Sequence, residues 1–235
     1  MDFKEKLKER FSAYNIELTD NQIESFEKYY NLLIEWNEKF NLTAITDEDE
    51  VIEKHFVDSV LPYEILPQNA KIIDIGAGAG FPSIPLKIVR PDLNFLLIDS
   101  VNKKITFINE VISNLNMSGI IAIHSRIEDL AVNPAYRETF DICISRAVAR
   151  LNTLAEYSLP FVKLGGKMIA YKSKQIDDEM FEARKAIKLL GGEIKEVSIN
   201  NLENGDRNVL VIEKETPTPE KFPRPKNLPR TKPIV

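Results

Sequence analysis

The sequence predicts an α/β fold with a mostly parallel, seven-stranded sheet that ends in an antiparallel hairpin. The first observation is that short apolar segments alternate with segments of helical periodicity between residues 71 and 190. This alternation is typical of a parallel sheet covered by helices on both faces. The second is that the last two strand-like segments, 193–199 and 207–214, are separated only by the turn-rich residues 200–206. That link is too short for a crossover helix, so these two strands should pair antiparallel.

The elements follow in order along the chain. Residues 1–66 are predicted to form a helical extension, because the apolar residues between Phe26 and Phe40 recur mostly every three or four positions, and Thr19 or Asp20 suits a helix start. Helix-breaking prolines at 62 and 67 close this region. Strands are then predicted at 71–75, 94–99, 119–123, 140–145 and 166–171, and helices at 82–90, 101–115, 151–158 and 176–190.

The sequence divides into three parts by composition. After the extension, residues 67–215 carry the alternating pattern of the main domain, and residues 216–235 form a basic, proline-rich tail with six prolines. Such a segment is predicted to be extended or polyproline-like rather than part of the core. Two interpretations stay open for the tail, a solvated segment and a basic arm that lies on a partner.

Composition limits the classes of function. Of 235 residues, 43% are apolar, which is enough for a substantial core. The apolar runs are much shorter than the roughly 20 residues of a membrane helix, and the charged N-terminus lacks a secretory signal, so we expect no membrane association and a cytoplasmic location. Cys143 is the only cysteine, which excludes an internal disulfide and a cysteine metal cluster. The net charge of −5 means that any nucleic acid must be bound by a local basic patch.

The glycine-rich segment KIIDIGAGAGFPSIPLK, residues 71–87, suggests a ligand site where the first strand ends. Its glycines, Gly76, Gly78 and Gly80, are spaced G-x-G-x-G, and Phe81 stands where the third glycine of the dinucleotide fingerprint would lie. No Gly-Lys-Ser/Thr follows, as a phosphate-binding Walker loop would require. The spacing therefore disfavours both a dinucleotide and a nucleoside triphosphate.

Two acids point to a different ligand. Asp74 lies near the end of the first predicted strand, where a carboxylate repels phosphate and favours a cationic group. Asp99 ends the second strand, the usual position of an acid that accepts hydrogen bonds from a ribose diol. S-adenosylmethionine fits this pair, because it carries a ribose, an ammonium and a sulfonium but no phosphate.

Several segments together resemble one family of class I, Rossmann-like methyltransferases. They are Asn41-Leu-Thr43, His55-Phe-Val-Asp58-Ser59, the run 74–85, and Ser145-Arg146-Ala147. In this order they resemble the ribosomal RNA small-subunit methyltransferase G family, also called the glucose-inhibited division protein B family. Two positions depart from its usual residues: Ser83 stands where glycine is common, and Tyr171-Lys172-Ser173 replaces leucine-lysine-glycine.

The resemblance implies an S-adenosylmethionine-dependent enzyme that methylates N7 of a guanosine in 16S ribosomal RNA of the small ribosomal subunit. By position, it implies that the cofactor loop contains Gly76, Gly78 and Phe81, that Asp99 binds the ribose, and that Arg146 lines the site. It also implies that Ile127 and Glu128 border the adenine. With Asp74, these residues are the predicted cofactor-binding set.

Guanine N7 has an in-plane lone pair and no proton to lose, so this methyl transfer needs alignment rather than a general base. Accordingly, no residue is predicted as a certain catalytic group, and Arg146 and Lys172, which follow the fourth and fifth strands, are the candidates for contacts with guanine or phosphate. His55 and Asp58 lie three apart, so on a helix they share a face and could hydrogen-bond, and they are too few for a metal site. Their predicted role is a buried polar pair that links the helical extension to the cofactor domain. We expect a monomer without metal.

Two alternatives stay open. The chain is a methyltransferase of another substrate, a small molecule or a protein, or it is a noncatalytic RNA-binding protein associated with the ribosome. Digestion of RNA before an assay separates the first alternative from an RNA methyltransferase. Transfer of labelled methyl groups to small subunits separates the second.

Overall fold

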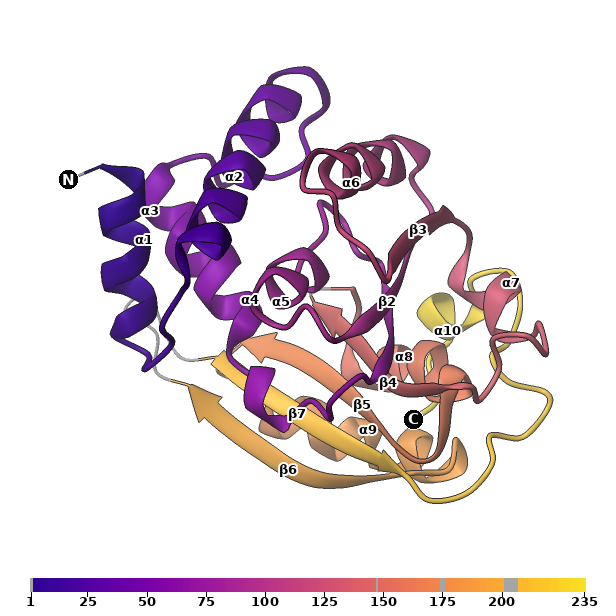
Figure 1. Ribbon diagram of the computed structural model, residues 1–235. Coiled ribbons are helices and arrows are strands. Elements are labelled where there is room, and N and C mark those ends of the chain that lie inside the picture. The colour runs from indigo at the N-terminus through magenta and orange to yellow at the C-terminus, as the bar shows by residue number, and fades with distance from the viewer. Residues whose placement is uncertain (1, 147, 174–175, 201–206) are drawn as a thin grey trace.

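The computed structural model describes residues 2–146, 148–173, 176–200 and 207–235. Seven strands form one sheet in the order β3-β2-β1-β4-β5-β7-β6 (Figure 1). In chain order the elements are α1 (Phe3–Ser12), α2 (Asp20–Phe40), α3 (Glu48–Val51), the π-helix η1 (Ile52–Val57), α4 (Asp58–Val60), η2 (Tyr63–Ile65), β1 (Lys71–Ile75), α5 (Ser83–Val89), β2 (Asn94–Asp99), α6 (Asn102–Asn114), β3 (Ile120–His124), α7 (Ile127–Ala131), β4 (Phe140–Arg146), α8 (Leu151–Ser158), η3 (Leu159–Phe161), β5 (Val162–Ser173), α9 (Asp177–Leu189), β6 (Gly192–Asn200), β7 (Arg207–Lys214) and α10 (Leu228–Thr231).

The predicted sheet is confirmed. Strands β1 to β5 pair in parallel, and β7 pairs antiparallel with both β5 and β6. The main difference is β5, which is longer than the predicted 166–171. The turn predicted at 200–206 falls mostly on residues 201–206, which lie outside the described residues. After β1 the chain adds β2 and β3 on one side of that strand and then crosses to add β4 and β5 on the other, so the strand order reverses between β1 and β4. Ligands of open α/β sheets bind at such a point, beyond the carboxyl ends of the strands.

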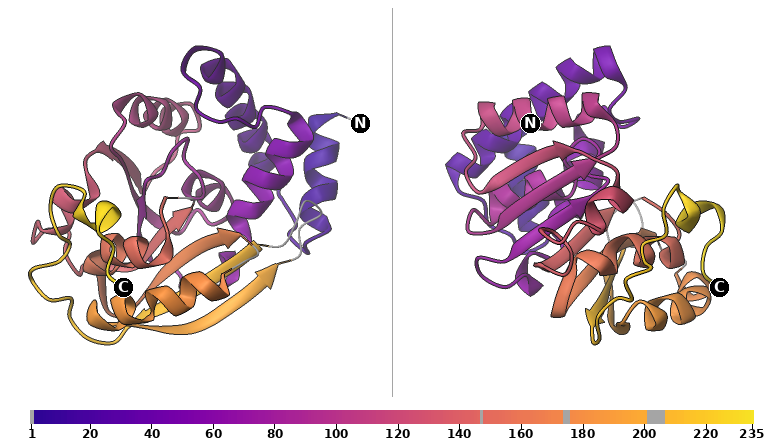
Figure 2. Two further views of the ribbon diagram at one scale, coloured as in Figure 1. Left: turned by 180° about the vertical axis from the view of Figure 1, so that it is seen from behind. Right: turned by 90° about the vertical axis from the view of Figure 1, so that its right-hand side faces the viewer.

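Two hydrophobic cores cover the two faces of the sheet, because alternate residues of each strand point to opposite sides. Ile72 packs with the N-terminal helices, α5 and α6, whereas the next residue, Ile73, packs with α8 and α9. The right-hand view of Figure 2 shows the sheet between these two layers. Each face is therefore buried, as the apolar character of the strands predicts.

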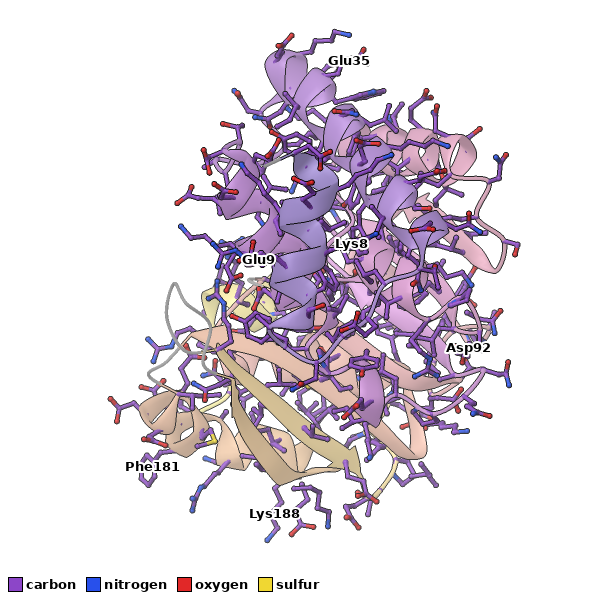
Figure 3. All side chains as sticks on the ribbon, turned by 60° about the vertical axis from the view of Figure 1, so that its left-hand side comes forward. Lys8, Glu9, Glu35, Asp92, Phe181 and Lys188 are labelled. Atoms are coloured by element: carbon purple, nitrogen blue, oxygen red, sulfur yellow. The ribbon has the colours of Figure 1, made fainter. Side chains whose placement is uncertain are left out.

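The N-terminal extension packs directly on the glycine-rich loop. Thr19 is the N-cap of α2 and forms a capping box with Gln22, as the predicted helix start requires. From the middle of α2, the Tyr29 hydroxyl donates a 2.6 Å hydrogen bond to the carbonyl oxygen of Ala79, inside the loop. Outward-facing residues of this layer are charged, and Figure 3 shows Lys8 and Glu9 on α1 and Glu35 on α2 pointing away from the fold.

The C-terminal tail differs from its prediction, since it packs against the main domain. Phe222 and Pro229 are buried, and residues 228–231 form the short helix α10. Side chains of the domain donate to the backbone carbonyls of the tail: Arg137 to Phe222 at 2.8 Å and Thr153 to Pro229 at 2.9 Å. Prolines lack an N–H, so the segment makes few backbone hydrogen bonds of its own, and charged and hydroxyl groups of the domain bind its carbonyls instead.

No helix of the described part of the chain has both the length and the apolar character needed to cross a membrane. Over the same residues, no group of three or more His, Cys, Asp or Glu side chains is arranged to hold a metal ion. Cys143 lies on β4 and is buried in the second core.

Candidate active site

Most backbone N–H groups of the loop after β1 donate to acceptors in the loop itself or at the end of β2. The amides of Gly76 and Ala77 donate to the carbonyl of Ile98, those of Gly80 and Phe81 donate to the carbonyl of Ala77, and the amide of Gly78 donates to a carboxylate oxygen of Asp99 at 3.0 Å. These donors are therefore not available to cradle phosphate oxygens, which agrees with the glycine spacing.

Gly76 is required by its conformation and its surroundings. Its φ of +71° lies in the left-handed region, and a Cβ atom there would approach Cγ2 of Val148 to 2.6 Å. That distance is shorter than any ordinary contact of a Cβ atom. Close approach of the loop to the segment after β4 thus depends on the missing side chain.

Asp99 is held in a fixed orientation at the end of β2. Its Oδ2 accepts from the Gly78 amide, and its Oδ1 accepts from the Val101 amide at 2.9 Å. Each carboxylate oxygen has a further lone pair, so the buried group can still accept hydrogen bonds from a ligand's hydroxyls. Lys104 Nζ lies 3.6 Å from Oδ2. This arrangement suits the ribose contact predicted for Asp99.

Asp74 lies behind the loop rather than on the wall of a cavity. Its side chain is fully buried and accepts a 2.6 Å hydrogen bond from the Ser83 hydroxyl. Burial outweighs the smaller lowering by the Ser83 hydrogen bond, so the pKa of Asp74 is raised to about 7. The predicted contact between Asp74 and the cofactor is not seen in the walls of the cavity, so its influence on the site passes through the loop.

The first cavity, of about 520 Å³, opens where β1, β2 and β3 end. Four of the predicted cofactor residues line it: Gly76, Asp99, Ile127 and Glu128. The other lining residues are Ser100, Val101, Lys104, Arg126, Val148, Ala149, Tyr157, Asn227 and Arg230. The polar groups of this cavity include a fixed acid that can accept from a diol, and the amides of Gly76, Ala77, Gly78, Gly80 and Phe81 already have acceptors, which fits a nucleoside without phosphate. Its cations suit the α-carboxylate of S-adenosylmethionine.

A second cavity, of about 480 Å³, lies beside the first, and Val148 and Ala149 line both. Arg146 and Lys172 belong to this second cavity, as do His55 and Asp58. The structure therefore separates Arg146 from the cofactor residues Asp99 and Glu128 and places it on the far side of a shared wall. Ala147, the last residue of the Ser145-Arg146-Ala147 motif, lies outside the described residues.

Arg146 joins the N-terminal extension to the end of β4. Its Nη1 donates to the carbonyl of Lys54 at 3.0 Å and to Oδ2 of Asp58 at 2.9 Å, and its Nη2 donates to Nδ1 of His55 at 3.1 Å. The π-helix η1 places these acceptors together, since such bulges redirect backbone carbonyls and side chains within a helix. The predicted polar link between the extension and the domain is confirmed, but it runs through Arg146 and not through a direct bond between His55 and Asp58.

The partners of His55 define its protonation. Arginine has only donors, so Nδ1 of His55 must be an acceptor, and the proton of the neutral ring is on Nε2, 2.9 Å from the hydroxyl oxygen of Thr43. Burial, followed by the positive charge of Arg146, lowers the pKa of His55 to about 3. His55 is therefore neutral at physiological pH and holds Arg146 in place.

Phe81 forms the floor beneath this cluster. Its ring stacks on His55 with 4.4 Å between centroids, and the guanidinium of Arg146 lies 4.9 Å above its centre. The structure thus puts the predicted cofactor residue Phe81 behind Arg146, away from the walls of the first cavity. An aromatic face beneath a guanidinium adds a cation–π attraction and fixes the plane of the fork.

Lys172 is committed to structural contacts. Its Nζ donates to the carbonyl of Ala149 at 2.8 Å and pairs with Oε2 of Glu179 at 2.7 Å. The same Glu179 oxygen accepts from the amide of Leu151 at 3.1 Å, at the start of α8. The predicted phosphate contact of Lys172 therefore does not match its geometry, because its donors fix the wall that the two cavities share.

Comparison with known proteins identifies the family. A model of the family described as rRNA small subunit methyltransferase G matches residues 22–210. The chain belongs to this family. It is 47% identical over 236 residues to the ribosomal RNA small subunit methyltransferase G of Brevibacillus brevis, covering 99% of each chain. It is 48% identical to the methyltransferase G of Desulforamulus reducens, covering 97% of each chain.

A solved structure agrees on the fold of this methyltransferase G chain. A SAM dependent methyltransferase from Aquifex aeolicus aligns with a TM-score of 0.55 over 73% of this chain and 96% of that chain. The two sequences are only 16% identical, so the likeness shows the fold alone. The class I methyltransferase fold and the family expected from the motifs are thus confirmed.

Sequence reasoning missed nine residues that line the first cavity, among them Tyr157, Asn227 and Arg230. Tyr157 lies on the predicted helix 151–158, but helical periodicity does not reveal which residue of a helix faces a cavity. Asn227 and Arg230 belong to the tail, whose prolines and basic residues are visible in the sequence but indicate only an extended segment.

Proposed function

We propose that this chain is an S-adenosylmethionine-dependent methyltransferase that transfers a methyl group to N7 of a guanosine in 16S ribosomal RNA. Membership of the methyltransferase G family supports the reaction class and the RNA substrate. The structural observation that carries the proposal is the pair of adjacent cavities with the common wall Val148 and Ala149. The first cavity has polar groups that suit a nucleoside, and the second is lined by an arginine, a neutral histidine and further cations.

The first cavity is the proposed donor site. Asp99 would accept hydrogen bonds from the ribose hydroxyls, Ile127 and Glu128 would border the adenine, and Gly76 lets the loop lie close to the ligand. When bound there, S-adenosylmethionine supplies a methyl group attached to a positively charged sulfur. The task of the chain is to hold the sulfur so that this methyl group faces the neighbouring cavity.

The second cavity is the proposed guanine site. Arg146 has five N–H groups, and three of them have acceptors in the described part of the chain, so two remain for a ligand. We assign these to guanine O6 or to a phosphate oxygen, because a hydrogen bond to N7 would occupy the lone pair that must attack. His55 does not serve as a base, since its Nδ1 accepts from Arg146.

The reaction itself needs no proton transfer before attack. N7 of guanine is a free lone pair at neutral pH, and the neutral state of His55 and the absence of a required base agree with that chemistry. The proposed contribution of the protein is alignment, with nucleophile and methyl carbon held within about 3 to 3.5 Å. We further propose that the chain acts as a monomer in the cytoplasm, which sedimentation velocity and cell fractionation test.

The decisive experiment is transfer of labelled methyl groups to small ribosomal subunits from a strain that lacks the gene. We expect one methyl group per subunit, located at N7 of a single guanosine when the RNA is mapped by cleavage at 7-methylguanosine. Label that survives digestion of the RNA would indicate a protein or small-molecule substrate. Binding of subunits without any transfer would indicate a noncatalytic RNA-binding protein. Either result overturns the proposed function.

A further inference from the structure

The C-terminal tail, residues 216–235, closes one side of the first cavity. Asn227 and Arg230 line that cavity beside Glu128 and Tyr157. The amide of Asn227 donates to Oε1 of Glu128 at 3.0 Å, and the Tyr157 hydroxyl donates to Oδ1 of Asn227 at 3.2 Å. The tail therefore meets the cavity at the residues predicted to border adenine.

The tail is fixed in this position by buried ionic contacts. Glu156 is fully buried, and Arg224 donates to it through Nε at 2.8 Å and Nη2 at 2.7 Å, while the Arg224 amide donates at 2.8 Å. This two-pronged pair is the strong form of a charged hydrogen bond. Lys226 and Asn227 then take φ values of +56° and +59°, which turn the chain back toward the cavity. The turn and the ion pair together set the direction in which α10 presents its side chains.

Arg230 differs from Arg224, the cation that anchors the tail. Arg224 is paired with Glu156, but the Arg230 side chain has no hydrogen bond or ion pair within residues 2–146, 148–173, 176–200 and 207–235. It lies nonetheless on the wall of the cavity, on the element whose Pro229 carbonyl is bound by Thr153. A planar guanidinium on a fixed element beside a nucleoside site can stack on a base or bind it with its fork of donors.

We propose that Arg230 binds the nucleoside end of the methyl donor and that the tail is a wall of the donor site, held there by Arg224 and Glu156. The inference rests on the proposed function, because it assigns the first cavity to S-adenosylmethionine. Arg230 contacts the ligand, whereas Arg224 positions it. An RNA contact is the competing assignment, and it is disfavoured because Arg230 lines the first cavity and not the second, where Arg146 lies.

The test measures binding of two ligands by calorimetry to the full chain and to Arg230→Ala. S-adenosylhomocysteine has the whole donor skeleton, and 5′-methylthioadenosine keeps adenine, ribose and thioether but lacks the amino-acid carboxylate. We expect Arg230→Ala to weaken both ligands by about the same factor, roughly ten-fold, which corresponds to about 1.4 kcal/mol. Lys232→Ala removes an exposed charge two residues away and outside the cavity, and should change neither affinity by more than about two-fold.

Each other outcome is decisive. If Arg230→Ala binds both ligands as tightly as the unaltered chain, the inference is wrong. Loss confined to S-adenosylhomocysteine would assign the guanidinium to the carboxylate and overturn the nucleoside contact. A raised KM for small subunits with unchanged donor affinities would make Arg230 an RNA contact and overturn it too. If the unaltered chain binds neither ligand, the proposed function itself fails, which separates that failure from the others.

Discussion

Substitution of Gly76 by alanine tests whether the wall between the cavities controls methyl transfer. The new Cβ atom would lie 2.6 Å from Cγ2 of Val148, and ordinary contact begins at 3.4 Å, so the Val148 side chain or the loop must move by about 0.8 Å. Val148 lines both cavities, so this movement changes the position of one ligand relative to the other.

The magnitude has two parts. A left-handed φ of +71° costs an alanine about 1 kcal/mol of stability. Displacement of reacting groups by about 1 Å lowers the rate about 100-fold in enzymes that act by alignment. We therefore expect Gly76→Ala to lose about 1 to 2 kcal/mol of stability and at least about ten-fold in kcat for labelled methyl transfer to small subunits.

Gly165 offers a matched control in the same chain. Its φ is +72°, nearly that of Gly76, but no atom lies within 4 Å of a Cβ built on it. Gly165→Ala should therefore lose comparable stability in urea unfolding and keep its rate of methyl transfer within about two-fold. Equal rates for Gly76→Ala and Gly165→Ala would refute the argument that the wall at Val148 aligns the reactants.

Two further predictions concern buried charge. Arg146→Met should lower the free energy of unfolding by about 2 kcal/mol, because it removes the 2.9 Å charged hydrogen bond of the fully buried Asp58 but leaves that carboxylate paired with Nε of Arg207 at 3.1 Å. It should abolish transfer while leaving calorimetric affinity for S-adenosylhomocysteine within about three-fold; a large loss of that affinity would contradict the assignment of Arg146 to the second cavity. Asp74 has its pKa raised from 3.8 to about 7 by burial, so the native state holds its proton more tightly and the stability of the wild type decreases as pH rises through 7. Asp74→Asn should remove this decrease in urea unfolding between pH 5 and 8, and parallel curves for the two proteins would contradict it.

The sheet was predictable from the sequence because its central strands, such as β1 and β2, are buried on both faces. Strands such as 71–75 and 94–99 are apolar, short and bounded by turn residues, and the structure reproduces these bounds. The antiparallel hairpin was predictable because a link of seven residues cannot hold a crossover helix. The local sequence pattern was therefore sufficient to predict the fold where strand burial and the length of a connecting segment allowed only one arrangement of the strands.

The assignment of residues to the two cavities was not predictable in the same way. Arg146 ends a strand, and this position indicates a site residue but not which neighbouring cavity its side chain enters. Its direction depends on His55 and Asp58, about 90 positions earlier, which the π-helix η1 turns toward it. The tail was misread for a related reason: its anchors, Arg137 and Glu156, look like ordinary surface charges in the sequence, and only the fold shows that Glu156 is fully buried and that both side chains bind the tail.

Two departures from the usual family residues also have structural roles. Ser83 donates to the buried Asp74, and the hydroxyl of Tyr171 donates a 2.5 Å hydrogen bond to the carbonyl of Ser59, next to Asp58. A glycine or a leucine at these positions has no donor for either bond. In this chain, the acid beneath the loop and the helix next to the partners of Arg146 are therefore each supported by a side-chain hydroxyl group.

Chemistry that depends on alignment explains why so many strong contacts lie one layer behind the ligands. Lys172 fixes Ala149 in the wall of the second cavity, whereas Tyr29 fixes Ala79 and the Arg224–Glu156 pair fixes the tail without lining either cavity. Because the reaction needs no general base, the gain in rate comes from rigid cavity walls that hold the two ligands in a fixed relative orientation. The extension and the tail, at opposite ends of the sequence, thus support the same site from the two faces of the sheet (Figure 2).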